Sequence, residues 1–416
     1  MNFPAHSGPL GPARLGRYAA GAVSHESDRA LTEHRPTTTG PALSGGALLD
    51  ALDAEGRRLG FARVGVTSAN PHTEAREHLE TWLARGYDGG LDYMRGADRA
   101  DPRALFPGAK SVVVAALAYP APAAGDRNRG HVAAYARGED YHLVMKRKLA
   151  GLADALANLA GTSLVARIAV DTAPLLERAL AARAGLGFIG KSTLLIVPGA
   201  GTHVVLGELL VDLELAPHAP AALEGCGSCR ACLDACPTGA ILEPFVVDAA
   251  LCISHATIEN PDAIRPELRE RLGTRVFGCD ECQSVCPFDR AGEHRPSAPE
   301  LSGRIPPAGL DLVRLLTQGN AGYRSLVKRT ALRRVTRDTL ARNAALALGN
   351  ARDSAAVPHL VRALAEHPSA IVRAHAAWAL GQLGTGEARA ALERAASDSD
   401  PSVAREARLA LGRGAT

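Results

Sequence analysis

Residues 226–241 read CGSCRACLDACPTGAI, residues 279–288 read CDECQSVCPF, and a single cysteine, Cys252, lies between these two runs. The first run has the C-x2-C-x2-C-x3-C-P spacing of bacterial ferredoxins that carry two 4Fe–4S clusters. The second run places three cysteines before Pro287. A proline at this point ends the short helix and turns the chain. The two runs therefore predict an electron-transfer module.

The spacing also sorts the cysteines into two ligand sets, because the fourth cysteine of each ferredoxin run crosses to the other cluster. We expect one cluster on Cys226, Cys229, Cys232 and Cys286, and the other on Cys236, Cys252, Cys279 and Cys282. These sets use all eight cysteines of the chain. The alternatives are two zinc sites, which usually take separated C-x2-C pairs, or a disulfide framework, which is typical of small secreted domains. The spacing favours clusters.

Length and charge set broad limits on the protein. The chain has 416 residues, enough for two or three domains, and a formal net charge of +3, so nucleic-acid binding would need a local basic patch. It has no apolar run of about 18 residues, and its N-terminus lacks a secretory or twin-arginine pattern. We expect a cytoplasmic protein that does not enter a membrane, since oxygen-sensitive clusters need a reducing compartment.

Composition and periodicity divide the chain into five parts. Residues 1–42 have no sustained apolar period and are expected to be disordered. Helical and strand patterns then alternate, including the buried-strand run at 110–119, which predicts an α/β core with a central sheet. The expected parts are the extension at 1–42, the α/β core at 43–220, an inserted ferredoxin-like module at 221–293, a connector at 294–322 and an all-α HEAT-like domain at 323–416.

Two short motifs are rejected. Residues 185–192 match the phosphate-loop pattern letter for letter, but that loop must follow a strand and begin a helix. Here a helical segment precedes the motif, and the residues after it predict a β-hairpin. Asp140 and His142 begin an Asp-x-His-x-x-Gly corrin-ligand motif, but Met145 stands where the glycine belongs.

Asp171 has two interpretations. It lies between the end of a predicted strand and a predicted helix, three residues before Pro174, where an aspartate often caps the helix N-terminus. Local chemistry favours this cap. The alternative is an acid at the mouth of an α/β cleft, where loops at strand ends hold catalytic groups.

The C-terminal part combines a basic segment with a repeat. Residues 324–342 hold seven basic residues and one acid, and the sequences ending at Gly349, Gly381 and Gly412 repeat every 31 to 32 residues. Such a period is typical of helix pairs in HEAT-like arrays, here too few for a long solenoid, so they must pack against the core. The basic segment is either a solvated helix face or a phosphate-binding surface, and its net charge favours the second.

The order of these motifs resembles the epoxyqueuosine reductase family. The resemblance rests on YARGEDYH at 135–142, DTAPLLERALAARAGLGFIGKSTLLI at 171–196, the two cysteine runs with CISHATIE between them, and the HEAT-like unit, and it covers about 48–412. It implies a monomeric oxidoreductase that reduces the epoxide of epoxyqueuosine at the tRNA wobble position to queuosine. It also implies cobalamin in the α/β core, two 4Fe–4S clusters and an unidentified low-potential electron donor.

The resemblance also implies roles for single residues. Asp171 matches the family's proton donor beside the cofactor. The other positions that match corrinoid contacts are Arg99, Ser254, Cys279 and Asp280. The positions that match the tRNA-facing basic pattern are Lys328, Arg329, Arg333, Arg334, Arg342 and Asn343. This chain departs from the family pattern at His255 and Ala256, where an aromatic residue and a leucine are usual, and at Phe188 and Ser192.

The chemistry is consistent with these parts. Clusters deliver one electron at a time, cobalamin supplies the hard reductive step, and the protein supplies position and a proton. A carboxyl group beside a corrin face is desolvated, so we expect a raised pKa that keeps Asp171 protonated. One alternative is a corrinoid reductive dehalogenase, which typically carries a twin-arginine signal and lacks helical repeats. A non-catalytic electron carrier is the other, and it leaves the residues before the clusters without a role.

Overall fold

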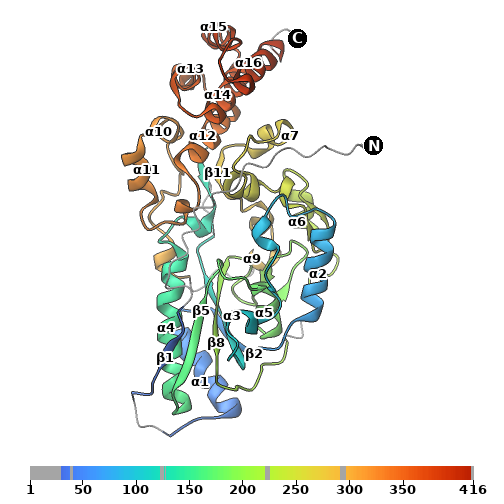
Figure 1. Ribbon diagram of the computed structural model, residues 1–416, viewed down its shortest axis with the longest axis vertical. Helices are drawn as coiled ribbons and strands as arrows, with labels where there is room; N and C mark the ends of the chain where they lie inside the picture. The colour runs from blue at the N-terminus through green and yellow to red at the C-terminus, as the bar shows by residue number, and fades with distance from the viewer. Residues whose placement is uncertain are drawn as a thin grey trace.

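The sheet with its helices, the cysteine-rich module and the helical repeats follow one another along the molecule (Figure 1). The computed structural model describes residues 30–37, 41–121, 126, 128–220, 225–290 and 297–413. Among these residues, no helix has the length and apolar character needed to cross a membrane.

The core is built on a five-stranded sheet in the order β1 (Thr32–His34), β5 (Leu164–Ala169), β8 (Val204–Val211), β3 (Ser111–Ala118) and β2 (Arg63–Ser68). Every neighbouring pair is antiparallel. The predicted buried strand at 110–119 is confirmed as β3, whose eight residues are all buried. A strand with both faces covered loses the polar alternation of a half-exposed one and becomes uniformly apolar.

Helices cover both faces of this sheet. On one face, α1 (Gly45–Arg58) and α4 (Tyr141–Ala160) pack into an apolar cluster with Val113, Leu117 and Leu209. The Asp140 carboxylate accepts from the His142 backbone N–H and caps α4, which ends at Gly161 in the left-handed conformation. On the other face, α5 (Glu177–Arg183) packs into a second cluster. Two further core helices are α2 (Thr73–Ala84) and α3 (Pro102–Leu105).

The predicted disordered extension is wrong in part. Residues 32–34 form β1, which pairs with β5 at the edge of the sheet, and His34 Nδ1 lies 2.7 Å from Asp154 Oδ1. Backbone pairing and this one buried side chain hold a segment that is too short to show an apolar period. Residues 1–29 and 38–40 lie outside the described residues.

The cysteine-rich module consists of short elements. They are α6 (Ala231–Ala235), β9 (Ile241–Glu243), β10 (Val246–Val247), η5 (His255–Glu259), α7 (Pro266–Arg269), β11 (Arg275–Phe277), α8 (Glu281–Ser284) and α9 (Pro287–Arg290). Strand β11 pairs in parallel with β4 (His131–Val132) of the core. This pairing joins the module to the chain that leads into α4.

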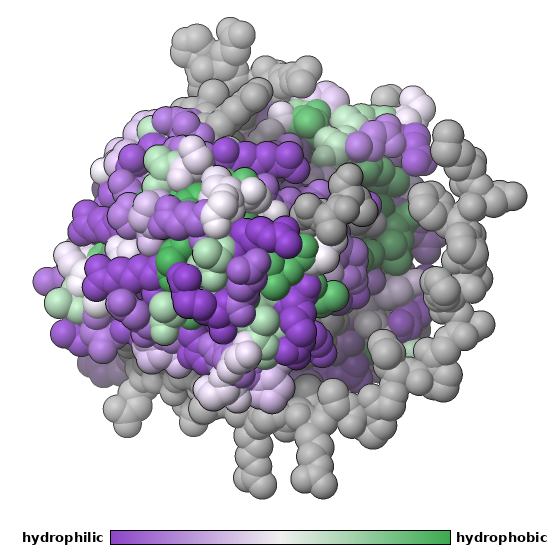
Figure 2. All heavy atoms as spheres, turned by 90° about the horizontal axis from the view of Figure 1, so that it is seen from above, coloured by the Kyte–Doolittle hydropathy of each residue, from purple (hydrophilic) through white to green (hydrophobic). Residues whose placement is uncertain are grey.

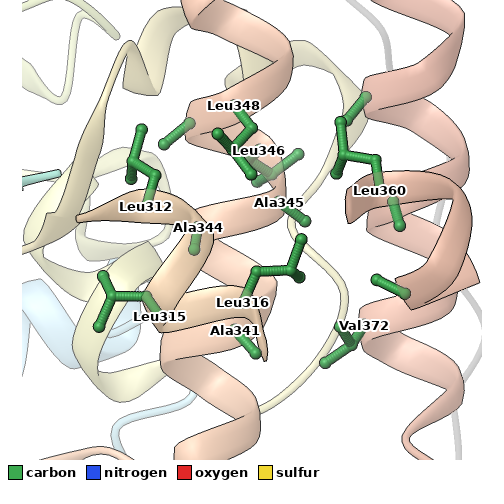
Figure 3. Packing of buried hydrophobic residues seen from close by; sticks show 14 of the residues in the cluster. Leu312, Leu315, Leu316, Ala341, Ala344, Ala345, Leu346, Leu348, Leu360 and Val372 are labelled. Carbon is green, nitrogen blue, oxygen red and sulfur yellow. The ribbon is translucent and has the colours of Figure 1, made fainter. Parts of the chain in front are cut away.

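The C-terminal helices are α12 (Arg337–Ala351), α13 (Val357–Glu366), α14 (Ala370–Leu383), α15 (Gly386–Ala395) and α16 (Pro401–Arg413). Their apolar cluster is continuous with module residues such as Ile264 and Phe277, as the expected packing against the rest of the protein requires. The predicted connector is partly helical, because α10 (Leu312–Thr317) and α11 (Asn320–Val327) fall around its end. Leu312, Leu315 and Leu316 of α10 pack against α12 (Figure 3).

Small residues let the repeated helices approach closely. A Cβ atom added to Gly349 of α12 would lie 2.8 Å from the Cα of Ala379 in α14. A Cβ atom added at the equivalent position of the last repeat, Gly412, would meet no neighbouring atom within 4 Å. The repeated glycine is therefore a packing requirement at the first position but not at the last.

We expect Gly349→Ala to destabilise the helical domain by about 1–3 kcal/mol, because the added methyl group overpacks the α12–α14 contact. Gly412→Ala is the matched control and should leave stability unchanged or slightly raised, since alanine favours helix. Denaturant unfolding followed by circular dichroism measures both. Equal effects of the two substitutions would contradict the packing role of Gly349.

Candidate active site between the sheet and the cysteine-rich module

A cavity of about 420 Å³ lies between the α/β core and the cysteine-rich module. The core contributes aromatic and acidic side chains to its wall, including Tyr135, Tyr141 and Asp171. The module contributes cysteines together with Ile253 and Ser254. Residues distant in sequence therefore surround one enclosed space, which is the usual form of a ligand site.

The structure brings the cysteines together in the two predicted sets. Cys236, Cys252, Cys279 and Cys282 all line the large cavity. Cys226, Cys229, Cys232 and Cys286 line a smaller cavity of about 20 Å³, which Cys282 also borders. All eight cysteines are free of disulfides. In the described part of the chain, no three His, Cys, Asp or Glu side chains form a site for a single metal ion.

The rejected phosphate-loop motif covers one side of the first cysteine set. It follows α5, as expected, but β6 (Phe188–Ile189) lies inside the motif and pairs with β7 (Leu195–Ile196). The hairpin expected after the motif is wrong, because the next strand, β8, pairs with β3 and β5 of the central sheet. Lys191 Nζ donates to the backbone carbonyls of Gly227 and Cys229 at 2.6 and 2.8 Å. This lysine therefore secures the cysteine loop instead of facing a phosphate.

Asp171 does not cap a helix. Helix α5 begins only at Glu177, and its N-cap residue, Leu176, provides no side-chain hydrogen bond. Asp171 instead adopts a left-handed backbone conformation, with φ 53°, and its side chain is 52% exposed. Its carboxylate reaches the cavity wall, where Oδ2 lies 3.3 Å from Nε2 of His142. A left-handed aspartate turned toward a cavity is typical of a functional site.

The proton of this pair belongs to the histidine. Burial alone would lower the pKa of His142, but its contacts with Asp140 and Asp171 outweigh burial and raise it to about 9. Nδ1 of His142 lies 2.7 Å from Asp140 Oδ1. For Asp171, burial raises the pKa, yet the hydrogen bond with His142, with help from Tyr141 and Arg334, leaves it below its ordinary value. The raised pKa expected for Asp171 applies to a carboxyl group beside a corrin face and stays a prediction.

The cavity wall combines aromatic and aliphatic side chains with polar ones. Tyr119, Tyr135 and Tyr141 form successive edge-to-face contacts at ring distances of 6.5 and 5.8 Å. Aliphatic side chains such as Leu195 and Ile253 complete the wall. Aromatic and aliphatic surfaces with few polar groups are the common lining of cofactor sites.

The predicted corrinoid contacts divide into two groups. Ser254 and Cys279 line the cavity beside Asp171. Arg99 and Asp280 are not among the lining residues. Arg99 instead donates to the backbone carbonyl of Tyr93 at 2.5 Å, and buried Asp280 accepts from the Ala134 backbone N–H at 2.9 Å.

Four of the predicted tRNA-facing residues are accessible. Lys328 and Arg329 are exposed, and Arg333 is half-buried. Arg334 donates to both carboxylate oxygens of Glu259, at 3.1 and 3.0 Å, and its guanidinium lies 5.9 Å from the centre of the Tyr93 ring. These residues lie on the stretch between α11 and α12.

The prediction that Arg342 and Asn343 face the tRNA is wrong. Both side chains are fully buried in α12. Arg342 donates to the carbonyls of Ala256, Asn260 and Asp262. Asn343 donates to the carbonyls of Thr257 and Val276 at 2.9 Å. A buried loop must satisfy its backbone carbonyls, and these two side chains do so for the module.

Sequence reasoning missed two acids beside Asp171. Glu177 lines the cavity, and its Oε1 accepts from the Asp171 backbone N–H at 2.5 Å. Glu208 is fully buried in the middle of β8. The sequence did contain a signal for Glu208, since VVLGELLV at 204–211 is apolar except for this acid.

Three family models match parts of the chain. The model for a 4Fe-4S double cluster binding domain matches residues 225–289, and the model for epoxyqueuosine reductase QueG matches residues 99–172. The HEAT repeat model matches residues 329–412. The chain therefore contains a double-cluster binding domain and HEAT repeats, as the sequence predicted.

Relatives and solved structures match nearly the whole chain. The epoxyqueuosine reductases of Escherichia coli K12 and Alicycliphilus denitrificans are 40% and 38% identical over 79% and 80% of this chain, covering 87% and 98% of their own lengths. A solved epoxyqueuosine reductase with an epoxyqueuosine-modified tRNA-Tyr stem loop has a TM-score of 0.81 and 31% identity, covering 89% of this chain and 99% of its own. The Bacillus subtilis enzyme, solved with its catalytic aspartate loop swung out of the active site, has a TM-score of 0.79 and 31% identity over 88% and 99%. The chain belongs to the epoxyqueuosine reductase family.

Proposed function

We propose that this protein reduces the epoxide of epoxyqueuosine to the alkene of queuosine at the wobble position of tRNA. The observation that carries the proposal is the arrangement of the cavity. Asp171, hydrogen-bonded to His142, lies on one wall, and the second cysteine set lies on the other. Residues that can supply protons and residues that can hold an electron-transfer cluster therefore line the same cavity.

The reaction needs both protons and electrons. Removing an epoxide oxygen as water breaks two C–O bonds, forms one C=C bond and consumes two electrons and two protons. 4Fe–4S clusters transfer electrons singly, which suits relay from a low-potential donor protein into the cavity. Backbone amides near the sulfurs tune such clusters, and the Ala240 N–H lies 3.2 Å from Cys236 Sγ.

The cavity is also the site at which the chain would hold cobalamin. Cobalamin, when bound, supplies the low-potential reductive chemistry that the amino acids lack. Tyr135 and Tyr141 would contact it from the core, and Ser254 and Cys279 from the module, because these side chains line the wall. The aromatic and aliphatic part of the wall lowers the local polarity, which strengthens electrostatic interactions beside it.

Asp171 and His142 supply the first proton. His142 carries it at neutral pH, and Asp171 reaches the cavity and is half exposed there. His142 gives this proton to Asp171 through the Oδ2–Nε2 contact, and Asp171 passes it to the epoxide oxygen as the ring opens. The family's catalytic loop can leave the site in the Bacillus subtilis relative. In this chain, the bond from Asp171 N–H to Glu177 holds the corresponding turn inward.

The exposed basic residues before α12 would bind the tRNA backbone. Lys328 and Arg333 present positive charge on the stretch between α11 and α12, where Arg329 is paired with Glu139. Figure 2 shows the repeat end of the molecule, and the surface there is mostly hydrophilic. A relative of the same fold binds an epoxyqueuosine-modified stem loop. We propose that the protein acts as a cytoplasmic monomer on tRNA.

We expect Asp171→Asn to lower turnover of epoxyqueuosine tRNA by about 10²–10⁴, because an amide cannot pass on a proton. Cluster content, cobalamin content and the tRNA dissociation constant should stay unchanged. Asp50→Asn, on the exposed face of α1, is the control and should keep full turnover. Product nucleosides from reconstituted enzyme are measured by mass spectrometry. Full turnover by Asp171→Asn would exclude the assigned role.

We expect Lys328→Ala and Arg333→Ala each to weaken tRNA binding and to reduce the slope of log affinity against log salt by about one. Arg58→Ala, at the far end of α1, should change neither quantity. Arg342→Ala should instead lower the melting temperature, because it removes hydrogen bonds to three backbone carbonyls and leaves the buried carbonyl of Ala256 without this donor. Filter binding over a salt series provides the slopes. If neither Lys328→Ala nor Arg333→Ala changes the slope, the tRNA binds at another surface of the protein.

A further inference from the structure

Behind Asp171 lies a pair of carboxyl groups that the reaction scheme has not used. Glu177 is the first residue of α5 and lines the cavity. Glu208 lies in the middle strand of the sheet, opposite Ala169 of β5 and Val114 of β3. The two side chains interact with each other. Glu177 also accepts the Asp171 backbone N–H, so the three acids form one connected group.

Glu208 is placed where a charge is costly. It is fully buried, and Leu206 and Leu210, two residues to either side, belong to the apolar cluster beneath α5. Strand alternation puts Glu208 on that same face. Among the described residues, no N–H or hydroxyl group reaches either of its oxygens with hydrogen-bond geometry, and its hydrogen-bonding neighbour is the Glu177 carboxyl group. The charged groups that act on it, Glu177 and Asp171, are both acids. An unpaired buried carboxylate would cost several kcal/mol, so Glu208 keeps its proton.

Glu177 then has the properties of a transferable acid. Burial, followed by the charge of Asp171, raises its pKa to about 7, whereas the pKa of Glu208 lies well above its ordinary value. The groups that face or adjoin Glu177 are Asp171, Glu208, His142, Arg178, Arg99 and Tyr141. Arg178 does not neutralise it directly, because its guanidinium donates to the carbonyl and hydroxyl of Thr193. An acid that titrates near the working pH transfers protons efficiently.

We propose that the Glu177–Glu208 pair is an internal proton reserve that recharges Asp171 within each turnover. This inference rests on the proposed function, which requires two protons while the Asp171–His142 pair holds one. The first C–O bond breaks as that pair protonates the oxygen. Glu177 then gives its proton to the Asp171 carboxylate. Asp171 protonates the departing hydroxyl group, which leaves as water as the second C–O bond breaks and the C=C bond forms. The clusters supply the two electrons.

The direction of the transfer follows from the charges. While His142 is protonated, its positive charge keeps the pKa of Asp171 low, so Glu177 holds its own proton. Once His142 has lost its proton, that cation is gone and Asp171 becomes the better proton acceptor. Glu177 and Glu208 thus act through Asp171, and the shared hydrogen bond keeps the donor beside the acceptor.

The test uses Glu208→Gln and Glu177→Gln in the full chain with both clusters and cobalamin. Each amide keeps the shape of a protonated carboxyl group, and the new side-chain oxygen at 177 can still accept the Asp171 N–H. Glu214→Gln, exposed beyond the end of β8, is the matched control. Melting temperature and cluster absorption verify that each variant folds.

The first readout is independent of activity. Infrared spectra of protein with ¹³C-labelled glutamate should show a protonated carboxyl band at pH 8 in wild type and Glu214→Gln, and the band should be absent in Glu208→Gln. If wild type lacks this band, Glu208 holds no proton at pH 8 and the proposed proton reserve is wrong. Should wild type show the band yet fail to act on epoxyqueuosine tRNA, the proposed function would be wrong, and the stored proton would stand.

The second readout is the pH profile of a single turnover. In wild type the rate should fall as pH rises through about 7, where Glu177 loses its proton, and again near 9, where His142 does. In Glu177→Gln the rate should be at least about tenfold lower, lack the inflection near 7, and be restored in part by small weak acids. A wild-type rate and profile in both glutamine variants would overturn the reserve.

Discussion

The crossed arrangement of eight cysteines is the constraint on which the rest of the structure depends. Cys236 follows the first run, whereas Cys252, Cys279 and Cys282 come later, yet all four line one cavity. Assembling this set folds residues 225–290 back on themselves and places their inner face against the sheet. The parallel pairing of β11 with β4 and the burial of Arg342 and Asn343 under the module secure this closure. Because the cavity lies between the module and the core, a group bound in it contacts residues of both parts.

Because the module closes onto the core, the residues for electron transfer and the residues for proton transfer come from different parts of the chain. The cysteines occupy one wall, and the acids reach the cavity from the loop after β5 and the start of α5. The pKa of His142 and the pKa of Glu177 are raised and the pKa of Asp171 is lowered, which favours protons on His142 and on the Glu177–Glu208 pair and an ionised Asp171 between them. Ionised Asp171 is thus placed to receive protons from two sides. An isolated aspartic acid would hold one proton and would then need a second one from solvent for each turnover.

Much of this architecture could be predicted from the sequence. The cysteine runs predicted the double-cluster domain, the apolar run at 110–119 predicted β3, and the repeated glycines predicted the helical array. Asp171 was ambiguous because a cap and a catalytic acid look alike before the start of α5 is known. Arg342 and Asn343 were misassigned because charge on a helix says nothing of what packs over it. The short β1 has no periodicity to detect. Glu177 and Glu208 meet only through the antiparallel sheet and α5, a pairing that no local pattern contains.

The central claim is that this chain reduces epoxyqueuosine in tRNA. It is tested most directly by nucleoside analysis of tRNA from cells that lack this protein and any second reductase of this kind. Epoxyqueuosine should accumulate in the deletion strain, and the wild-type gene should restore queuosine, whereas a gene encoding Asp171→Asn should not. Normal queuosine in the deletion strain would contradict the account and would direct attention to a small-molecule substrate for the same cavity.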